Sequence, residues 1–563
     1  MTQGQRPEPT REEQGLLRSC FAGSDKLSWG FVGHCKALLV YPEFAGTSFW
    51  NYRDTCEILG AKYPAAPLGL ITVAALLPPT WSVRLVNRNT EELRDEDLEW
   101  ADLVMTGGML PQQRDTLHVI ALAHARRKPV VIGGPDATCN PGVYQAADFQ
   151  VLGEAEEIIA EFLAEWERGA AGGVFKARAS PDLAHSPVPR FDLLKLDQYL
   201  HVGVQFSRGC PFNCEFCSVI DLNGRAPRAK TPGQMLRELD ALRATGHRGH
   251  VDFVDDNLIG NRKALKPFLR ELSTWLDARG RPFEFTTEAS LDLADDDELL
   301  ELMRKSNFFA VFVGIETPDP KALLAANKGQ NTRRDIVESV HKIHRAGIFV
   351  NAGFIIGLDA EGDDVASAMV DCIERASIPV CMVGLLYALP GTQLAKRLLA
   401  EGRLEPDGHR PGEDDADQCS SGLNFEPLRP RRDILRDHRA VIDRIYAPAA
   451  FFGRARRAAR ELDCSAHHVV PSLRNVARDL HGFARMAWRM GVMDSRVRAE
   501  WWLTLGHCLV HNPRALKIVL SFGALYLHLG GYSQQLVERL DRQIDLCEPA
   551  STTPERARVA PGV

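Results

Sequence analysis

The sequence predicts an α/β protein with three parts: a doubly wound, Rossmann-like N-terminal domain, a partial (β/α) barrel and a C-terminal helical domain. Three observations support this fold class. Short apolar runs typical of buried strands alternate with helical patterns between residues 36 and 154. The same alternation restarts at Val202, and from Arg431 onward the apolar residues follow the helical period. With 563 residues, the chain has the length of about three or four domains.

We expect five segments along the chain. They are an N-terminal extension (1–34), the doubly wound domain (35–179), a linker (180–199), the partial barrel (200–400) and a C-terminal loop with the helical domain (401–563). Within the last segment, residues 401–425 are rich in Gly, Asp and Glu and are predicted to form a loop near the barrel mouth, and residues 548–563 a frayed tail.

Composition and charge restrict the kinds of partner and cellular location that this protein can have. Hydrophobic residues make up 45% and charged residues 25%, as in ordinary soluble proteins. The formal net charge of −7 argues against a nucleic-acid partner, which requires a basic surface. Thirteen cysteines without a regular framework, and a polar N-terminus without an apolar leader, favour a reducing, cytoplasmic location. The nearest candidate for a membrane span, Leu516 to Gly530, is short and interrupted by Lys517 and His528.

In the N-terminal domain, strands are predicted at 36–42, 82–87, 101–108, 129–135 and 149–154, with helices at 67–77 and 114–126. Three of these strands end in glycine, namely at Gly107 and Gly108, at Gly133 and Gly134, and at Gly153. Doubly wound sheets bind ligands at the carboxyl ends of their strands, where glycine lets the backbone approach phosphate or ribose. Glycines that serve only turns are the alternative.

Polar residues and glycines recur at the predicted strand ends of the barrel, where barrel active sites lie. In chain order they are Asp255, Asp256 and Asn257, then Glu288, Glu316, Gly353 with Gly357, and Tyr387. Each has a structural alternative: capping of the next helix for the acidic residues, a β-bulge for the glycines, and packing for the tyrosine.

Between the first two barrel strands, Cys210, Cys214 and Cys217 form a C-x3-C-x2-C motif in which Gly209 shapes a tight loop and Phe216 provides an apolar wall. Four thiolates would complete an iron–sulfur cubane, so three leave one iron open to an outside ligand. A structural zinc loop or three unconnected thiols are the alternatives. Structural zinc usually takes four ligands, and no second Cys or His pair follows nearby.

This spacing resembles that of the radical SAM superfamily. The segments Phe253–Asn261, Gly314–Asp319 and Ala388–Thr392 further resemble the cobalamin-binding (class B) radical SAM family, to which hopanoid C-2 methylase belongs. The resemblance covers residues 36–446 strongly. It implies that the three cysteines hold a [4Fe-4S] cluster, and that the open iron binds S-adenosylmethionine (SAM) and cleaves it to a 5′-deoxyadenosyl radical.

The resemblance also suggests roles for the strand-end residues. It implies contacts of Glu288 with the SAM ribose or amino group, of Glu316 with the methionyl group, and of Gly353 and Gly357 with adenine. Phe216, Asp256, Asn257 and Tyr387 are further candidates for contacts with SAM or substrate. Ser218 departs from the aspartate that often follows the third cysteine in relatives, and this difference bears on the substrate.

The N-terminal domain resembles a cobalamin-binding domain, with the five strand-end glycines as the predicted contacts. It lacks the Asp-x-His-x-x-Gly signature, so the protein is expected to give cobalt no histidine, an arrangement that favours methyl transfer. The alternative is a Rossmann-like domain without a cofactor.

The leading hypothesis is cobalamin-dependent methylation of an unactivated carbon in a natural-product or lipid intermediate, with flavodoxin or ferredoxin as electron donor. Ring formation, oxygen insertion or transfer of the aminocarboxypropyl part of SAM are alternatives within the family. A cobalamin or iron–sulfur sensing module is the alternative from another class. The C-terminal helices either cover the active site or, given Trp501 and Trp502, provide an amphipathic surface for peripheral membrane contact or an apolar substrate.

Overall fold

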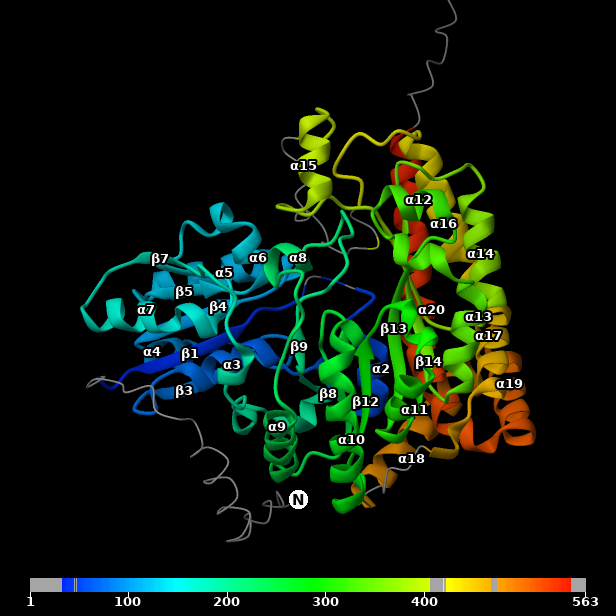
Figure 1. Cartoon of the computed structure of the whole chain (residues 1–563), viewed down its shortest axis with the longest axis horizontal. Coiled ribbons are helices and arrows are strands. Elements are labelled where there is room, and N and C mark those ends of the chain that lie inside the picture. Colours follow the sequence, from blue (N-terminus) through cyan, green and yellow to red (C-terminus); the bar gives the residue numbers. More distant parts are fainter. Residues whose placement is uncertain are drawn as a thin grey trace, which may run out of the picture.

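The computed structural model describes residues 33–44, 46, 48–405, 419, 422–466 and 473–547. The predicted N-terminal extension, most of the predicted loop at 401–425 and the predicted tail lie outside the described residues. Figure 1 shows the N-terminal domain (blue to cyan) on the left, the barrel strands (green) in the centre and the C-terminal helices (yellow to red) on the right.

The N-terminal domain is built on a six-stranded parallel sheet, as predicted. Its order is β3 (Ser82–Asn87), β1 (Lys36–Tyr41), β4 (Leu103–Gly107), β5 (Val130–Gly133), β6 (Phe149–Leu152) and β7 (Gly173–Lys176). Helices α3 (Leu68–Leu76) and α7 (Ala155–Glu167) cover one face, and α4 (Asp95–Trp100) and α5 (Gln113–Ala125) cover the other. Because both faces are covered, the central strands are almost continuously apolar.

The second sheet is a seven-stranded, entirely parallel partial barrel. Its order is β15 (Cys381–Leu385), β14 (Phe349–Ile356), β13 (Phe308–Glu316), β12 (Phe283–Glu288), β11 (Gly249–Phe253), β8 (Tyr199–Val204) and β2 (Tyr63–Ala65). Its outer face is covered by α9 (Pro232–Ala244), α10 (Arg262–Ala278), α11 (Asp297–Lys305), α13 (Ile336–Arg345) and α14 (Val365–Arg375).

The sequence analysis missed the edge strand β2, because three residues that include a proline are too few to show the alternating pattern of a strand. It pairs Tyr63 with Tyr199, across more than a hundred residues of chain. The preceding helix α2 (Arg53–Leu59) also packs on the C-terminal helices. A segment of the predicted N-terminal domain therefore belongs, by its contacts, to the barrel.

The C-terminal region is helical, as its periodicity predicts. It comprises α16 (Arg431–Ile445), α17 (Pro448–Glu461), α18 (Leu473–Trp488), a π-helical turn (Arg489–Met493), α19 (Arg498–His511) and α20 (Leu516–Leu546). Helix α20 closes the open side of the barrel, where Phe522 packs on Phe349 with ring centroids 5.0 Å apart and Lys517 pairs with Glu284. Barrel and helices share one hydrophobic core.

Helix α20 is also longer than the stretch considered from sequence. Together with the turn before it, Pro513–Leu546 is long and apolar enough to cross a membrane by length and composition. Of its most apolar 18-residue window, 61% is buried inside the protein. That burial identifies it as a core helix of this fold.

Replacing Gly107 with alanine should destabilise the N-terminal domain. A Cβ atom at this position would overlap with the carbonyl oxygen of Gly133, because the two residues are paired in neighbouring strands. We expect a loss of about 1–3 kcal/mol, seen as a melting temperature lower by about 2–4 °C per kcal/mol. Gly69→Ala is the control, because its Cβ would meet open space within a helix. Equal melting temperatures for the two variants would contradict the close approach.

Acid should weaken the attachment of α16 to the barrel through His438. The imidazole donates from Nε2 to the carbonyl of Val383 (2.9 Å), and burial lowers its pKa to about 4. Between pH 6.5 and 4 the unfolded chain binds a proton that the folded chain does not, so stability is lost as pH falls, by up to about 3 kcal/mol. In His438→Gln, which does not titrate, this loss should vanish. Melting curves of both proteins from pH 7 to 5 test this, and parallel curves would refute it.

Candidate active site

The three-cysteine loop lies at the carboxyl end of the barrel and is closed by a two-stranded ribbon. The ribbon pairs β9 (Ser207–Arg208) with β10 (Arg228–Ala229). Gly209 adopts φ +98°, and a Cβ there would lie 2.9 Å from the carbonyl oxygen of Gly224, so only glycine fits at this position. Cys214 is buried, and Cys210 and Cys217 are partly exposed.

Side-chain amides approach two of the sulfurs. Asn257 directs its Nδ2 toward Cys210 Sγ (3.9 Å), and Gln330 directs its Nε2 toward Cys214 Sγ (3.6 Å). Such donors stabilise the negative charge of thiolate ligands and orient them. Of these two, Asn257 was predicted as a cofactor-site residue, and Gln330 was missed because it follows no strand.

Burial affects the protonation of two of the three thiols. It raises the pKa of Cys210, and raises the pKa of Cys217 to about 12, so both bind metal only with release of a proton. The cluster remains a prediction from the three-cysteine motif.

The acidic residues after β11 hold the loop in place. Asp256 accepts hydrogen bonds from the Gly209 N–H (2.7 Å) and from Asn223 Nδ2 (2.9 Å). Asp255 accepts from the Phe206 N–H (2.9 Å) and the Ser207 hydroxyl (2.6 Å), and burial raises its pKa to about 7. The structure thus gives both carboxylates partners within the protein, and a cofactor contact for Asp256 stays a prediction.

The middle of the loop is anchored by Glu215. Its carboxylate receives two hydrogen bonds from Arg397 (2.9 and 3.0 Å) on α15 (Gln393–Ala400). Its backbone N–H donates to the carbonyl of Ala326, and its own carbonyl accepts from the Leu394 N–H. A bidentate pair of this kind fixes both distance and orientation. The loop between the second and third cysteines is therefore attached to α15 and to Ala326 at the end of α12 (Pro320–Ala325).

Glu316, predicted from its strand-end position, lies in a buried ion pair with Lys328 beside the cysteine loop. Burial disfavours the charge of Lys328, but the carboxylate of Glu316 and the nearby Cys214 outweigh it and raise the pKa of the ammonium. Its Nζ lies 5.8 Å from the ring centroid of Phe216. Glu316 adopts φ +67°, a strained backbone for this residue type, and such strain is concentrated at functional sites.

Side chains that point into the barrel are polar on three neighbouring strands and aromatic on the next. They remain partly exposed although the strands are flanked by helices, whereas their outward-pointing neighbours are buried. On β8, β11 and β12 they form a polar wall of His201, His250, Asp252, Thr286 and Glu288. On β13 they are Phe309 and Phe312, with Trp50 packed on Phe312, and Phe312 lies in register between Glu288 and Asn351 of β14. The lumen of the partial barrel is therefore lined by both kinds of side chain.

On the polar wall, a hydrogen-bond chain orients Asp252. His250 Nε2 donates to the Thr286 hydroxyl (2.7 Å), which donates to Asp252 Oδ1 (2.5 Å). One oxygen of Glu288 and Oδ1 of Asn351 are buried without a hydrogen-bond partner within the part of the chain that the structure describes. Burial and the nearby Asp252 raise the pKa of Glu288 well above its usual value. Unpaired buried acceptors of this kind are suited to a ligand with hydrogen-bond donors.

The five predicted glycines of the N-terminal domain lie at the carboxyl ends of β4, β5 and β6 and form a ledge with little side-chain cover. A Cβ at Gly107 or Gly108 would collide with Gly133 or Gln112, and Gly134 and Gly153 have positive φ angles. At these four positions the fold itself requires the absence of a side chain. It also leaves backbone accessible along this edge.

The ledge faces the cysteine loop. Helix α6 (Pro135–Cys139), which starts at the ledge, contacts α8 (Val219–Leu222), which follows the third cysteine. Arg208 binds Glu154 (2.7 Å) and Glu156 (2.8 Å), and Arg228 binds Glu154 (2.6 Å). The carboxyl ends of both sheets are therefore joined at one interface.

The other predicted residues differ in what surrounds them. Gly353 lies flat beside Phe312, whose ring a Cβ would meet at 3.1 Å. Gly357 (φ +102°) faces Leu423 instead, and its N–H donates to Glu361 (2.8 Å). Tyr387 is half-buried, and burial together with Asp136 beside the ledge raises its pKa. Tyr387 therefore lies between the barrel and the N-terminal domain. Cofactor contacts at these positions stay predictions.

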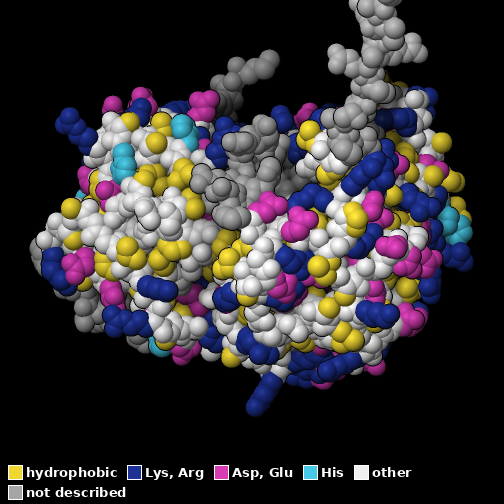
Figure 2. Space-filling view, turned by 90° about the horizontal axis from the view of Figure 1, so that it is seen from above, with side chains coloured by type: hydrophobic (Ala, Val, Ile, Leu, Met, Phe, Trp, Pro, Cys, Tyr) yellow, Lys and Arg dark blue, Asp and Glu magenta, His cyan; other side chains and the backbone are white. Residues whose placement is uncertain are grey.

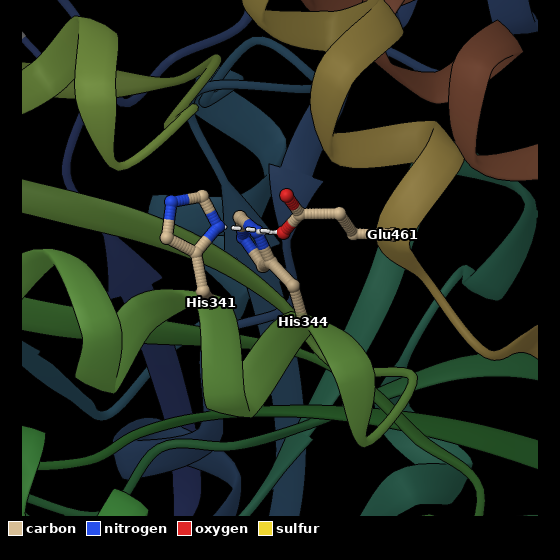
Figure 3. Close-up of side chains that lie close together, drawn as sticks. All are labelled: His341, His344 and Glu461. Atoms are coloured by element: carbon tan, nitrogen blue, oxygen red, sulfur yellow. Dashed lines mark hydrogen bonds and ion pairs between the residues drawn. The ribbon is translucent and has the colours of Figure 1, made fainter.

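A second cluster, His341, His344 and Glu461, has the spacing of a metal site (Figure 3). Its hydrogen bonds oppose that function. Nε2 of His344 accepts from the Val350 N–H (3.3 Å), so Nδ1, which faces Glu461, carries the hydrogen. His341 contacts Glu461 (2.6 Å) and the Arg375 carbonyl (2.9 Å), both acceptors. The cluster instead attaches α17 to α13.

The comparisons with known proteins agree with this geometry. The Radical SAM superfamily model matches residues 204–373, and Domain of unknown function (DUF4070) matches residues 392–542. The chain is 41% identical over 512 residues to an uncharacterized methyltransferase of Synechocystis (90% of this chain, 94% of the relative). It is 34% identical over 496 residues to hopanoid C-2 methylase of Rhodopseudomonas palustris (86% and 92%).

Two solved structures share the whole architecture. The cobalamin-dependent SAM radical enzyme OxsB, with aqua-cobalamin and SAM bound, superposes with a TM-score of 0.59 at 13% identity, covering 96% of this chain and 89% of OxsB. TsrM from Kitasatospora setae, a radical SAM methyltransferase with cobalamin and a [4Fe-4S] cluster bound, gives 0.53 at 15% identity (91% and 100%).

The fold and the three-cysteine loop define a radical SAM enzyme. Within that superfamily the chain belongs to the group of hopanoid C-2 methylase and its relatives, which are named as methyltransferases. The predicted family and fold class are thereby confirmed.

Removing the anchor of the loop should weaken cluster binding without unfolding the protein. Arg397→Ala deletes the bidentate contact to Glu215, and we expect faster loss of iron from the reconstituted protein on incubation with a chelator. Lys396→Ala on the same helix is the control, since Lys396 makes only an exposed ion pair with Asp221. Anaerobic iron analysis and the cluster absorbance measure the effect. Equal iron loss from both variants would show that the anchor is dispensable.

Proposed function

We propose that the chain is a cobalamin-dependent radical SAM methyltransferase acting on an unactivated carbon. The observation that carries this proposal is the apposition of the three-cysteine loop and the glycine ledge. One holds ligands for a [4Fe-4S] cluster with an open iron, and the other offers backbone to a large planar cofactor. When bound, the cluster supplies the electron that cleaves SAM and cobalamin carries the methyl group.

In this proposal Cys210, Cys214 and Cys217 are the iron ligands. Asp256, Asn257 and Gln330 hold the loop and its sulfurs, and Phe216 with Lys328 forms the adjoining wall. Glu288, Glu316, Gly353, Gly357 and Tyr387 are the proposed contacts to SAM. Among these, Glu288 has an unpaired buried oxygen and is the strongest candidate for binding a hydroxyl or ammonium group.

Cobalamin is proposed to lie on the ledge formed by Gly107, Gly108, Gly133, Gly134 and Gly153. The ledge segments 107–113, 133–140 and 153–156 contain no histidine, so they offer cobalt no imidazole. The exposed Met109 beside them provides an apolar contact. The solved relatives OxsB and TsrM, which bind cobalamin, support this placement by their fold.

The lumen suggests the character of the substrate. Its polar wall around Asp252 would bind a hydroxyl or amino group, and the aromatic side chains Trp50 and Phe312 beside it would contact an apolar skeleton. A lipid-like or natural-product intermediate has both a polar group and an apolar skeleton.

The reaction requires an outside electron donor, which we propose to be flavodoxin or ferredoxin. It also requires a reducing compartment such as the cytoplasm.

Radical reactions without methylation, including ring formation, oxygen insertion and aminocarboxypropyl transfer, differ in their products. Methyl transfer yields S-adenosylhomocysteine together with 5′-deoxyadenosine, whereas the others yield no S-adenosylhomocysteine. Anaerobic reconstitution with iron, sulfide and hydroxocobalamin, followed by product analysis, distinguishes them. A protein that retains no cobalt absorbance would refute the methyltransferase proposal. A sensing role is disfavoured by membership in a group of enzymes.

The first variant to test is Cys214→Ala. Loss of one of three thiolates should abolish formation of 5′-deoxyadenosine from SAM and dithionite, because two ligands cannot hold the cluster. Cys547→Ala, at the end of α20 and outside the loop, should retain the activity of the parent. Substantial 5′-deoxyadenosine from the Cys214 variant would refute the ligand assignment.

A further inference from the structure

Helices α18 and α19 expose a continuous set of apolar side chains. The family model that covers both helices, DUF4070, has no assigned function. On α18 these residues recur every fourth position, at Val476, Leu480, Ala484 and Trp488. On α19 they are Ala499, Trp502, Leu503, Gly506, Leu509 and Val510. Both series lie on one side of their helix, the side turned away from the core.

The two series meet where α18 passes through the π-helical turn toward α19. There Trp488, Val492, Met493 and Trp502 are 61%, 45%, 65% and 47% exposed. The indole N–H of Trp502 donates to the carbonyl of Gly491 (3.0 Å), which fixes α19 against the turn. We call this set, with the two series that extend from it, the α18–α19 surface.

Packing within the part of the chain that the structure describes does not explain this exposure. The opposite side of α19, with Trp501, Leu505 and Cys508, is already buried, against α17 and α20. On α18, Met486 is buried and Gly482 packs against Leu59 of α2. Helix α19 is therefore apolar on both its sides. A helix of this kind is normally covered on both sides or lies against lipid.

Charge around the α18–α19 surface is positive. Between Val476 and Arg514 the chain has six arginines and three acidic residues, in a protein whose net charge is −7. The three acidic residues have arginine partners: Asp479 pairs with Arg478, Asp494 with Arg496, and Glu500 with Arg456 outside the segment. Glu57 of α2 lies near Arg485 and Arg489. Arg498 and Arg514 remain without an ion pair to the described residues, so the surplus of charge is positive. By contrast, basic and acidic side chains are interspersed on the face at the α15 end of the molecule (Figure 2).

We propose that the α18–α19 surface binds the headgroup region of an anionic lipid bilayer, with the protein lying on one leaflet. Tryptophan side chains prefer the interface between headgroups and acyl chains. Arginines at the border of an apolar surface can bind lipid phosphates while the apolar side chains enter the leaflet. The positive local charge complements an anionic surface in a protein that is acidic as a whole.

The surface also lies near the amino-terminal end of the barrel. Burial, with the nearby guanidinium groups of Arg248 and Arg478, lowers the pKa of His247, which precedes β11, to about 4. Lys517 at the start of α20 pairs with Glu284 at the start of β12. A membrane-bound protein would thus hold the amino-terminal end of the barrel against lipid, with the cysteine loop at the opposite end. This inference goes beyond the proposed function, because binding to a membrane does not depend on methyl transfer.

Sedimentation of the full-length, cluster-reconstituted protein with vesicles tests the proposal. We expect binding to phosphatidylcholine vesicles that contain phosphatidylglycerol, weaker binding to phosphatidylcholine alone, and release by increasing salt. The triple variant Trp488→Ser, Val492→Ser, Met493→Ser should lower the partition coefficient about tenfold or more. Arg498→Gln with Arg514→Gln, which removes two arginines without an ion pair to the described residues, should reduce binding only to the anionic vesicles.

The matched control is Val174→Ser, Leu324→Ser, Leu428→Ser, which removes three equally exposed apolar side chains elsewhere. It should bind vesicles like the parent. Iron content and melting temperature establish that both triple variants are folded, and SAM cleavage without vesicles should be unchanged in both.

Four results would overturn the proposal. The first is no vesicle binding by the parent protein, and the second is equal binding by both triple variants. The third is a vesicle-free dimer that becomes a monomer only in the α18–α19 variant, which would identify the surface as an interface between copies. The fourth is protein that resists salt and requires detergent for release, which would indicate that α20 spans the bilayer.

Discussion

The architecture depends on one interaction, the ion-pair network that joins the two parallel sheets at their carboxyl ends. Arg208, in the strand that enters the cysteine loop, binds both Glu154 and Glu156, which follow β6 of the N-terminal sheet. Burial opposes ionisation of Glu156, but the hydrogen bonds and charge of Arg208 outweigh it and lower the pKa of the carboxyl. Breaking such a network would leave buried charges unpaired, so it holds the two cofactor-binding edges in a fixed relation.

Around this junction the protein separates its polar and apolar surfaces in an unusual way. Inside the barrel, histidine, carboxylate and amide side chains face an accessible lumen, and α20 closes the open side with Phe522 and Lys517. On the outside, α18 and α19 leave tryptophan and aliphatic side chains in solvent. The catalytic proposal depends on the first feature, and the membrane proposal depends on the second.

Much of the fold could be predicted because its strands are buried on both sides. Strands β1, β3 and β6 lie within the apolar runs identified from sequence, and the alternation of strand and helix led to two parallel sheets. Strand β2 could not be predicted, because a three-residue strand is stabilised by its partner β8 and not by its own pattern. Of the polar wall only Glu288 was predicted. His250 and Asp252 were missed, although alternate polar residues in a central strand were a readable signal.

By itself, the sequence determined the local chemistry of this protein: three thiols in one short loop, glycines after three strands, and a helical C-terminal third. These are properties of neighbouring residues, for which spacing and period are sufficient. Only the tertiary structure decided that the loop faces the glycine ledge, that Glu316 is paired with Lys328, and that Gly357 faces Leu423 and not open space. Contacts between residues far apart in the chain depend on how whole elements pack, and no local pattern records that packing.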